Sequence, residues 1–271
     1  MHQPTDPGPD QLSALWERWR PGLLPLAATA RPALLPHLRA VDHDQTVDIP
    51  FSLALSGYAV PLRAVASVVG SAGCEAQLEG WPAAPAAPDP APAISRAGVD
   101  AGALAALDGW VAALVAGRVA MLNLLQGSPP GELLPAAMPA WHEALVRPAV
   151  AAGLVPPSRA AGPRQFHLAG APSPVRVDAC VGRMWELAEA EPAWDVRALL
   201  LHLAVLWVRP RPGANGRLAR LLLNTLRCAA GHPWLQIPPA RADAYRQACA
   251  AACARGEAGP FARLVAACAA R

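Results

Sequence analysis

The chain has 271 residues, 54% of them hydrophobic, and its 23 basic and 20 acidic residues give a net charge of +3. This length can hold one domain with a normal core plus a smaller part, and the small, dispersed charge argues against a nucleic-acid partner. The apolar run over 198–208 is shorter than the ~20 residues that span a bilayer, and the N-terminus lacks a signal-peptide pattern, so we expect a cytoplasmic protein with no membrane contact.

The first 80 residues are predicted to form a small N-terminal helical region. Apolar residues at helical spacing predict a short amphipathic helix over 11–20. Four prolines follow, at positions 21, 25, 32 and 36. They are predicted to divide the next segment, which ends near Arg39, into short pieces. A segment of proline and alanine over 81–97 is predicted to be a linker to a core over 98–271.

The core is predicted to be helical over most of its length. Apolar periodicity indicates helices over 99–126, 135–150 and 177–190, and two more over 241–271 that separate near 256–260. The six cysteines include no Cys-x-x-Cys pair, and His142 lacks the second histidine of a zinc motif. We therefore expect reduced, buried cysteines, a structural His142 and no metal site.

Residues 196–230 read as helix, basic loop, helix. The first helix is apolar on every side except at His202, which is typical of a fully buried helix, and Pro210 and Pro212 end it. The Gly213-Ala214-Asn215-Gly216 loop then presents free N–H groups and the positive end of a helix dipole, with Arg217 in the first turn. This predicts a phosphate site; the alternative is a capped turn whose arginines are merely solvated.

The stretch resembles the signature of the Fic (Fido) family, His-x-Phe-x-Asp/Glu-Gly-Asn-Gly-Arg-x-x-Arg. Asn215, Gly216, Arg217 and Arg220 match it, and Ala214 stands where the family most often has glycine. Further similarity lies in His202, the Leu-Leu-Leu-Asn-Thr-Leu run over 221–226, the Ala-Gly-His-Pro run over 230–233, and Tyr245. The resemblance implies an all-α helical bundle with a small β-hairpin flap over 164–170, which in the family grips a protein target by strand addition.

The departures from the signature fall on its chemistry. Arg209 replaces the histidine that takes a proton from the target hydroxyl, Arg211 replaces the phenylalanine, and Gly213 replaces the acidic residue that holds Mg²⁺. A guanidinium stays protonated, so Arg209 cannot act as the base, and loss of a general base typically slows a reaction by ~10²–10⁴. We expect little or no ordinary AMP transfer, and Gly213 argues against Mg²⁺.

A second, weaker resemblance lies in the segment 48–70. Many Fic proteins carry an inhibitory motif, Ser/Thr-x-x-x-Glu-Gly/Asn, whose glutamate pairs with the second arginine of the signature. Ser52, Ser56 and Gly57 match its spacing, with Ser56 in place of the glutamate. The resemblance implies that Arg220 lacks its inhibitory partner and is free for a ligand.

These residues lead to three competing functions. The family resemblance places phosphate groups on Ala214, Asn215, Gly216, Arg217 and Arg220, and Arg209 and Arg211 add positive charge, so a nucleotide or diphosphate without metal is the expected ligand.

A pseudoenzyme or regulator, with a protein partner at the flap 164–170, is favoured over a repurposed transferase or lyase and over a structural interaction module. Arg209 and His167, which lies in the flap, are the candidate catalytic residues.

Overall fold

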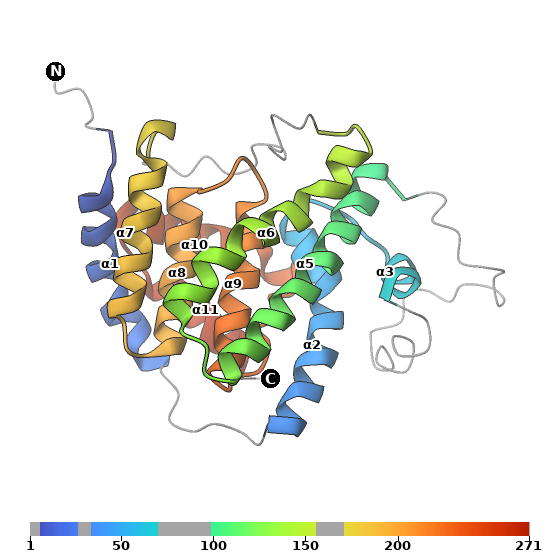
Figure 1. Cartoon of the computed structure of the whole chain (residues 1–271), viewed down its shortest axis with the longest axis horizontal. Coiled ribbons are helices and arrows are strands. Elements are labelled where there is room, and N and C mark those ends of the chain that lie inside the picture. Colours follow the sequence, from blue (N-terminus) through green and yellow to red (C-terminus); the bar gives the residue numbers. More distant parts are fainter. Residues whose placement is uncertain (1–5, 27–33, 70–98, 156–170, 271) are drawn as a thin grey trace.

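The computed structural model describes residues 6–26, 34–69, 99–155 and 171–270, and within these ranges all regular structure is helical (Figure 1). The expected all-α bundle is therefore confirmed for the described residues. The predicted flap over 164–170, with His167, and the linker over 81–97 lie outside them. The helices are α1 (Pro9–Leu23), α2 (Leu34–Leu55), α3 (Leu62–Val69), α5 (Ala101–Leu125), α6 (Pro130–Ala151), α7 (Val177–Ala190), α8 (Trp194–Val208), α9 (Asn215–Ala229), α10 (Ala242–Arg255) and α11 (Gly259–Ala269), with short 3-10 turns η1 (Leu24–Leu26), η3 (Pro174–Arg176) and η4 (Pro239–Arg241).

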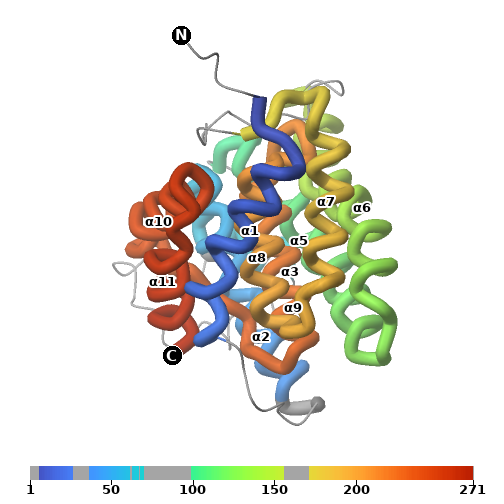
Figure 2. The backbone as a smooth tube through the Cα atoms, turned by 90° about the vertical axis from the view of Figure 1, so that its left-hand side faces the viewer, coloured from blue at the N-terminus to red at the C-terminus, as the bar shows by residue number. Residues whose placement is uncertain are grey.

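Helices α8 and α9 form the centre of the bundle. They pack against each other, with α5 and α6 on one side, α1 and α7 on another, and α10 and α11 behind (Figures 1 and 2). Between Val196 and Val208 every residue of α8 is buried except Leu206, as its apolar sequence predicts. The two predicted core helices are therefore the elements around which the others pack.

Two of the four prolines do not divide the N-terminal region as predicted, whereas α1 ends just before Pro25 in η1, and Pro32 lies outside the described residues. Helix α1 continues through Pro21, and α2 runs unbroken from Leu34 to Leu55 through Pro36 and Pro50. Pro36 lies in the first turn of α2, where a backbone N–H has no acceptor within the helix, so a proline costs little there. Elsewhere the burial of side chains on both helices compensates for the lost hydrogen bonds.

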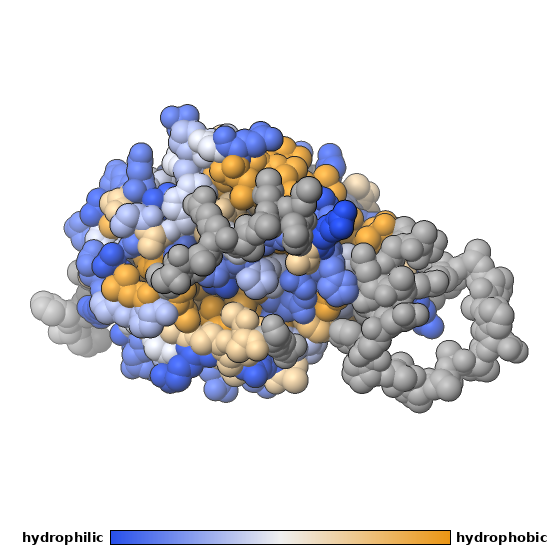
Figure 3. Space-filling view, turned by 90° about the horizontal axis from the view of Figure 1, so that it is seen from below, coloured by the Kyte–Doolittle hydropathy of each residue, from blue (hydrophilic) through white to orange (hydrophobic). Residues whose placement is uncertain are grey.

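Helix α5 is the most apolar long element of the described chain. Its length and composition alone would allow it to cross a membrane, yet 56% of its most apolar window is buried in the bundle. Gly109 lets it touch α6, because a Cβ there would lie 2.5 Å from the carbonyl oxygen of Leu145. Its outer side carries the exposed Val115 and Val119, and hydrophobic patches among hydrophilic residues are also visible on the face in Figure 3.

His202 is the polar exception within α8 and has a structural role. Its Nε2 lies 3.1 Å from the hydroxyl oxygen of Tyr245 on α10, and its ring stacks on Phe261 of α11 at 5.2 Å. Burial lowers the pKa of His202 to about 3, so the ring is neutral. This residue therefore joins the central helix to the two C-terminal helices.

Candidate functional site

The site is built on the loop between α8 and α9. Arg209 ends α8 in the left-handed conformation (φ 54°, ψ 59°), and Ala214, just before α9, has φ 53°. Left-handed backbone costs a residue with a Cβ roughly 1–2 kcal/mol. The loop is therefore held in this shape by its surroundings rather than by local preference.

Two polar side chains hold the loop in place: Asn215, at the start of α9, and His142, on the neighbouring helix α6. Asn215 accepts a hydrogen bond from the backbone N–H of Arg211 at 3.1 Å and donates one to the carbonyl oxygen of the same residue at 2.6 Å. On α6, Nε2 of His142 lies 3.2 Å from the carbonyl oxygen of Gly213, and burial lowers the pKa of His142 to about 4. A neutral His142 thus donates to the loop, and the Asn215 side chain shapes the loop instead of reaching for a ligand.

The first turn of α9 is uncapped and faces a cavity of about 610 Å³. Ala214, at the N-cap, has no side-chain hydrogen bond, and the first helical bond is donated by Leu218 to Ala214 at 2.9 Å. The N–H groups of Asn215, Gly216 and Arg217 precede that bond and have no acceptor in the described part of the chain. No side chain caps this terminus, and such a terminus can hold an anion; the phosphate site stays a prediction.

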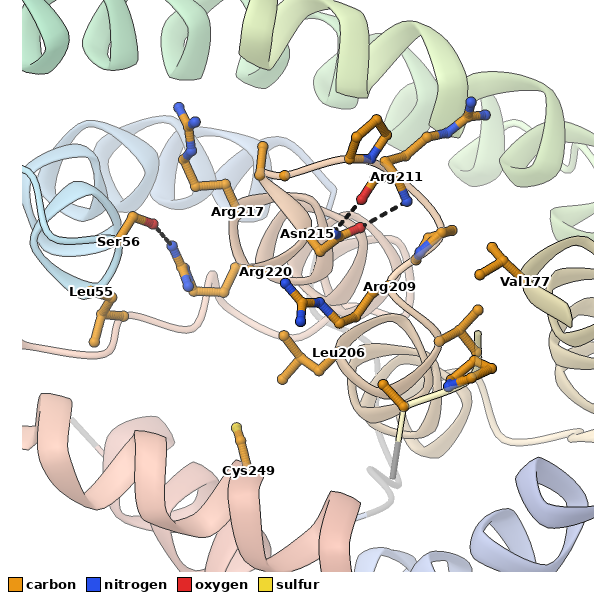
Figure 4. Close-up of a pocket in the computed structure, with 18 of the residues that line it drawn as sticks. Leu55, Ser56, Val177, Leu206, Arg209, Arg211, Asn215, Arg217, Arg220 and Cys249 are labelled. Atoms are coloured by element: carbon orange, nitrogen blue, oxygen red, sulfur yellow. Dashed lines mark hydrogen bonds between the residues drawn. The ribbon is translucent and has the colours of Figure 1, made fainter. Parts of the chain in front are cut away.

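The four arginines line this cavity but do not all point into it (Figure 4). Arg209 extends toward Arg220, whereas Arg211 points away toward α6. Arg217 points away on the other side, where its Cζ lies 5.5 Å from the ring centroid of Tyr58 and its Nη1 lies 3.4 Å from the carbonyl oxygen of Ala106. We refer to Arg209 and Arg220 as the cationic pair of the site, although the guanidinium of Arg220 is itself turned toward Ser56 (Figure 4).

Burial distinguishes these arginines from a solvated surface. Arg217 and Arg220 are only 6% and 4% exposed, and burial lowers the pKa of Arg217 to about 10. The alternative of merely solvated arginines is therefore wrong for both residues.

Arg220 is not free, contrary to the expectation from the second resemblance. Its Nε donates to the hydroxyl oxygen of Ser52 at 2.7 Å, and its Nη2 donates to the Ser52 carbonyl oxygen at 2.8 Å and to the Ser56 hydroxyl oxygen at 2.7 Å. Ser52 lies on α2, and Ser56 lies in the turn that follows its last residue, next to Gly57, which has φ 86°. Ser56 thus supplies an acceptor where the motif has glutamate, but it leaves the charge of Arg220 unneutralised.

Asp48, which the sequence analysis did not single out, lies behind this contact. It precedes Ser52 by one turn of α2, is 2% exposed, and accepts a hydrogen bond from Nε1 of Trp234 at 3.1 Å. Burial raises the pKa of Asp48 to about 7, while the charge of Arg220 opposes that shift. The spacing of Asp48, Ser52 and Ser56 by four residues was the available signal, since it places all three on one helix face.

Helix α10 and the start of α7 complete the cavity. Tyr245, Arg246 and Cys249 line it from α10, and Asp178 is the acidic residue among the described residues that line it. Cys249 is buried, as predicted, and burial raises the pKa of its thiol to about 12.

In the described part of the chain no group of three or more histidine, cysteine or acidic side chains could hold a metal ion.

Over the described residues these features define a helical bundle with an uncapped helix terminus between two buried central helices. The same fold occurs in a solved Fic protein: a fragment of Fic-1 from C. elegans superposes with a TM-score of 0.59 at 18% identity over 96% of this chain and 68% of that chain. A variant of that fragment gives a TM-score of 0.61 at 19% identity over the same shares. No family model and no curated protein matches the sequence. The structure therefore shows the Fic fold.

Proposed function

We propose that this Fic-fold protein is a pseudoenzyme that binds a nucleotide or another phosphorylated ligand in the cavity and regulates a partner without AMP transfer. The observation that carries the proposal is Arg209, which stands where the signature has its catalytic histidine and extends into the cavity toward Arg220 (Figure 4). A base has been replaced there by a permanent cation. The flap over 164–170 is the proposed contact for a protein partner.

The loss of transfer follows from the chemistry of the loop. Arg209 cannot accept a proton from a hydroxyl group, and Gly213 offers no carboxylate to a metal ion. Mg²⁺ supplies much of the charge stabilisation in phosphoryl transfer. The site therefore lacks both the base that activates the hydroxyl group and the residue that holds the metal ion. Transfer at this site should be at least ~10²–10⁴ slower than with a positioned base.

Ligand binding is supported by the charge around the first turn of α9. Two guanidinium groups with the same charge repel each other unless an anion lies between them. Arg209 can form paired hydrogen bonds with phosphate oxygens, whereas Arg220 keeps only its Nη1 donors because its Nε and Nη2 are bonded to Ser52 and Ser56. The uncapped N–H groups of α9 add further donors. The protein can thus neutralise a phosphate group without a metal ion.

A thermal-shift panel with ATP, ADP and inorganic diphosphate, each with and without Mg²⁺, tests the proposal together with an AMP-transfer assay. We expect metal-independent stabilisation by at least one ligand, a loss of at least tenfold in affinity in Arg209→Gln and Arg220→Gln, and no transfer. Arg263→Gln, at an exposed position of α11, is the matched control and should bind as the parent does.

Two other results of these assays would each favour a different function. No stabilisation by any phosphate compound would reject the binding site and favour a structural interaction module. Turnover of the bound ligand would favour a repurposed transferase or lyase, because the same cationic pair can stabilise a departing phosphate.

A further inference from the structure

The cavity has an apolar compartment beside its cationic pair. Leu55, Leu206 and Cys249 surround the space next to Arg209 and Arg220 (Figure 4). Leu206 is the one residue between 196 and 208 that is not fully buried, and it opens onto this space. The cavity, at about 610 Å³, falls in the range of sites that enclose a whole small molecule, so its ligand is larger than a phosphate group.

The two side-chain hydroxyl groups that line this compartment already have partners. The Tyr245 hydroxyl is bonded to His202, and the Ser56 hydroxyl is bonded to Arg220 and to the carbonyl oxygen of Ser52. The thiol of Cys249 is buried and remains protonated. A nucleobase enclosed here would leave donors and acceptors unpaired, each at a cost of about five- to 150-fold in affinity.

The opposite end of the cavity is also poor in hydrogen-bonding groups. It is formed by Ala171, Pro172, Pro174 and Val177, which carry apolar side chains, and the two prolines offer no backbone N–H. Asp178 lines the cavity at this end, and its negative charge would repel a phosphate group placed there, so the phosphate group of a ligand belongs at the other end, beside Arg209.

We infer that the ligand is a phosphate or diphosphate ester of a hydrophobic alcohol. Its anionic group lies between Arg209 and Arg220 at the first turn of α9, and its apolar chain packs against Leu55 and Leu206. This inference rests on the proposed phosphate site and names the class of its ligand. The same chemistry occurs in soluble esters and in the headgroup region of phosphatidic acid, and the experiment separates these two sources.

Isothermal titration in the presence of EDTA tests the inference with butyl, hexyl and octyl phosphate below their micellar concentrations, and with ADP and inorganic phosphate as comparators. Each methylene group that enters the compartment should tighten binding about fourfold. Octyl phosphate should therefore bind more tightly than butyl phosphate and ADP. In parallel, sedimentation with phosphatidylcholine vesicles that contain or lack phosphatidic acid assigns the source: soluble ester if only octyl phosphate binds, lipid if the anionic vesicles bind.

Two variants test where the alkyl chain of the ligand lies. Leu206→Gln should weaken the dependence on chain length, so that the ratio of the affinity for octyl phosphate to the affinity for inorganic phosphate falls. Leu24→Gln is the control because Leu24 is exposed on η1 and does not line the cavity. An affinity that does not change with chain length, or tighter binding of ADP than of octyl phosphate, would overturn the inference but keep the proposed function. Failure of every phosphate compound to bind would reject both.

Discussion

Replacement of Arg209 by glycine should separate stability from ligand binding at this site. Arg209 holds a left-handed conformation that costs a residue with a Cβ roughly 1–2 kcal/mol, whereas glycine adopts it freely. Glycine also increases the backbone entropy of the unfolded chain, which offsets roughly 0.5–1 kcal/mol of that gain. We expect Arg209→Gly to be about 1 kcal/mol more stable than the parent when no ligand is present.

Urea denaturation with and without inorganic diphosphate measures both effects. In the parent, diphosphate at 100 times its dissociation constant should add about 2.7 kcal/mol to the free energy of unfolding. Arg209→Gly should lose most of this increment because the guanidinium is absent.

Arg209→Ala is the matched control for backbone strain, since it removes the guanidinium but keeps the Cβ. The alanine variant should lack the gain in stability and should bind diphosphate as weakly as the glycine variant. If the glycine variant is no more stable than the alanine variant, the backbone at Arg209 is not strained and the reasoning fails.

Three further substitutions test the surroundings of the loop. Ala214→Gly should raise the free energy of unfolding by about 1 kcal/mol in urea denaturation, because Ala214 also has a positive φ; no gain would contradict this. Ser56→Glu should place a carboxylate on Arg220 and weaken diphosphate binding at least tenfold by titration calorimetry, whereas the uncharged Ser56→Gln should not; equal effects would exclude a role of charge. Burial raises the pKa of Asp48 from 3.8 to about 7, so the folded chain keeps a proton that the unfolded chain releases, and stability falls as the pH rises from about 4 to about 7. Asp48→Asn should abolish this loss, at most about 4 kcal/mol, and should match the parent below pH 4; parallel pH profiles would contradict the shift.

The central helices could be predicted because their sequence leaves little choice. A helix that is apolar on all sides must be buried, and α8 is. The lengths of α1 and α2 could not be predicted, because proline preferences are local whereas the packing that overrides them is tertiary. Pro36 is tolerated where it falls in the first turn of α2, a position that only the structure reveals.

The candidate site shows the same division between local and tertiary information. The loop chemistry predicts an anion-attracting helix terminus, which stays a prediction. The cavity at the first turn of α9 could not be predicted, because residues from several distant helices line it. The directions of the arginine side chains depend on neighbours far away in the sequence, such as Tyr58 and Ala106 beside Arg217. The contact of Arg220 with Ser52 and Ser56 joins residues more than 160 positions apart.

The most direct test of a metal-free phosphate site is titration calorimetry of inorganic diphosphate in EDTA and again in excess Mg²⁺, with the parent and Arg209→Gln. We expect that the parent binds in EDTA at least as tightly as in Mg²⁺, and that Arg209→Gln binds at least tenfold more weakly in EDTA. Binding that requires Mg²⁺, or equal affinity of the two proteins, would contradict it.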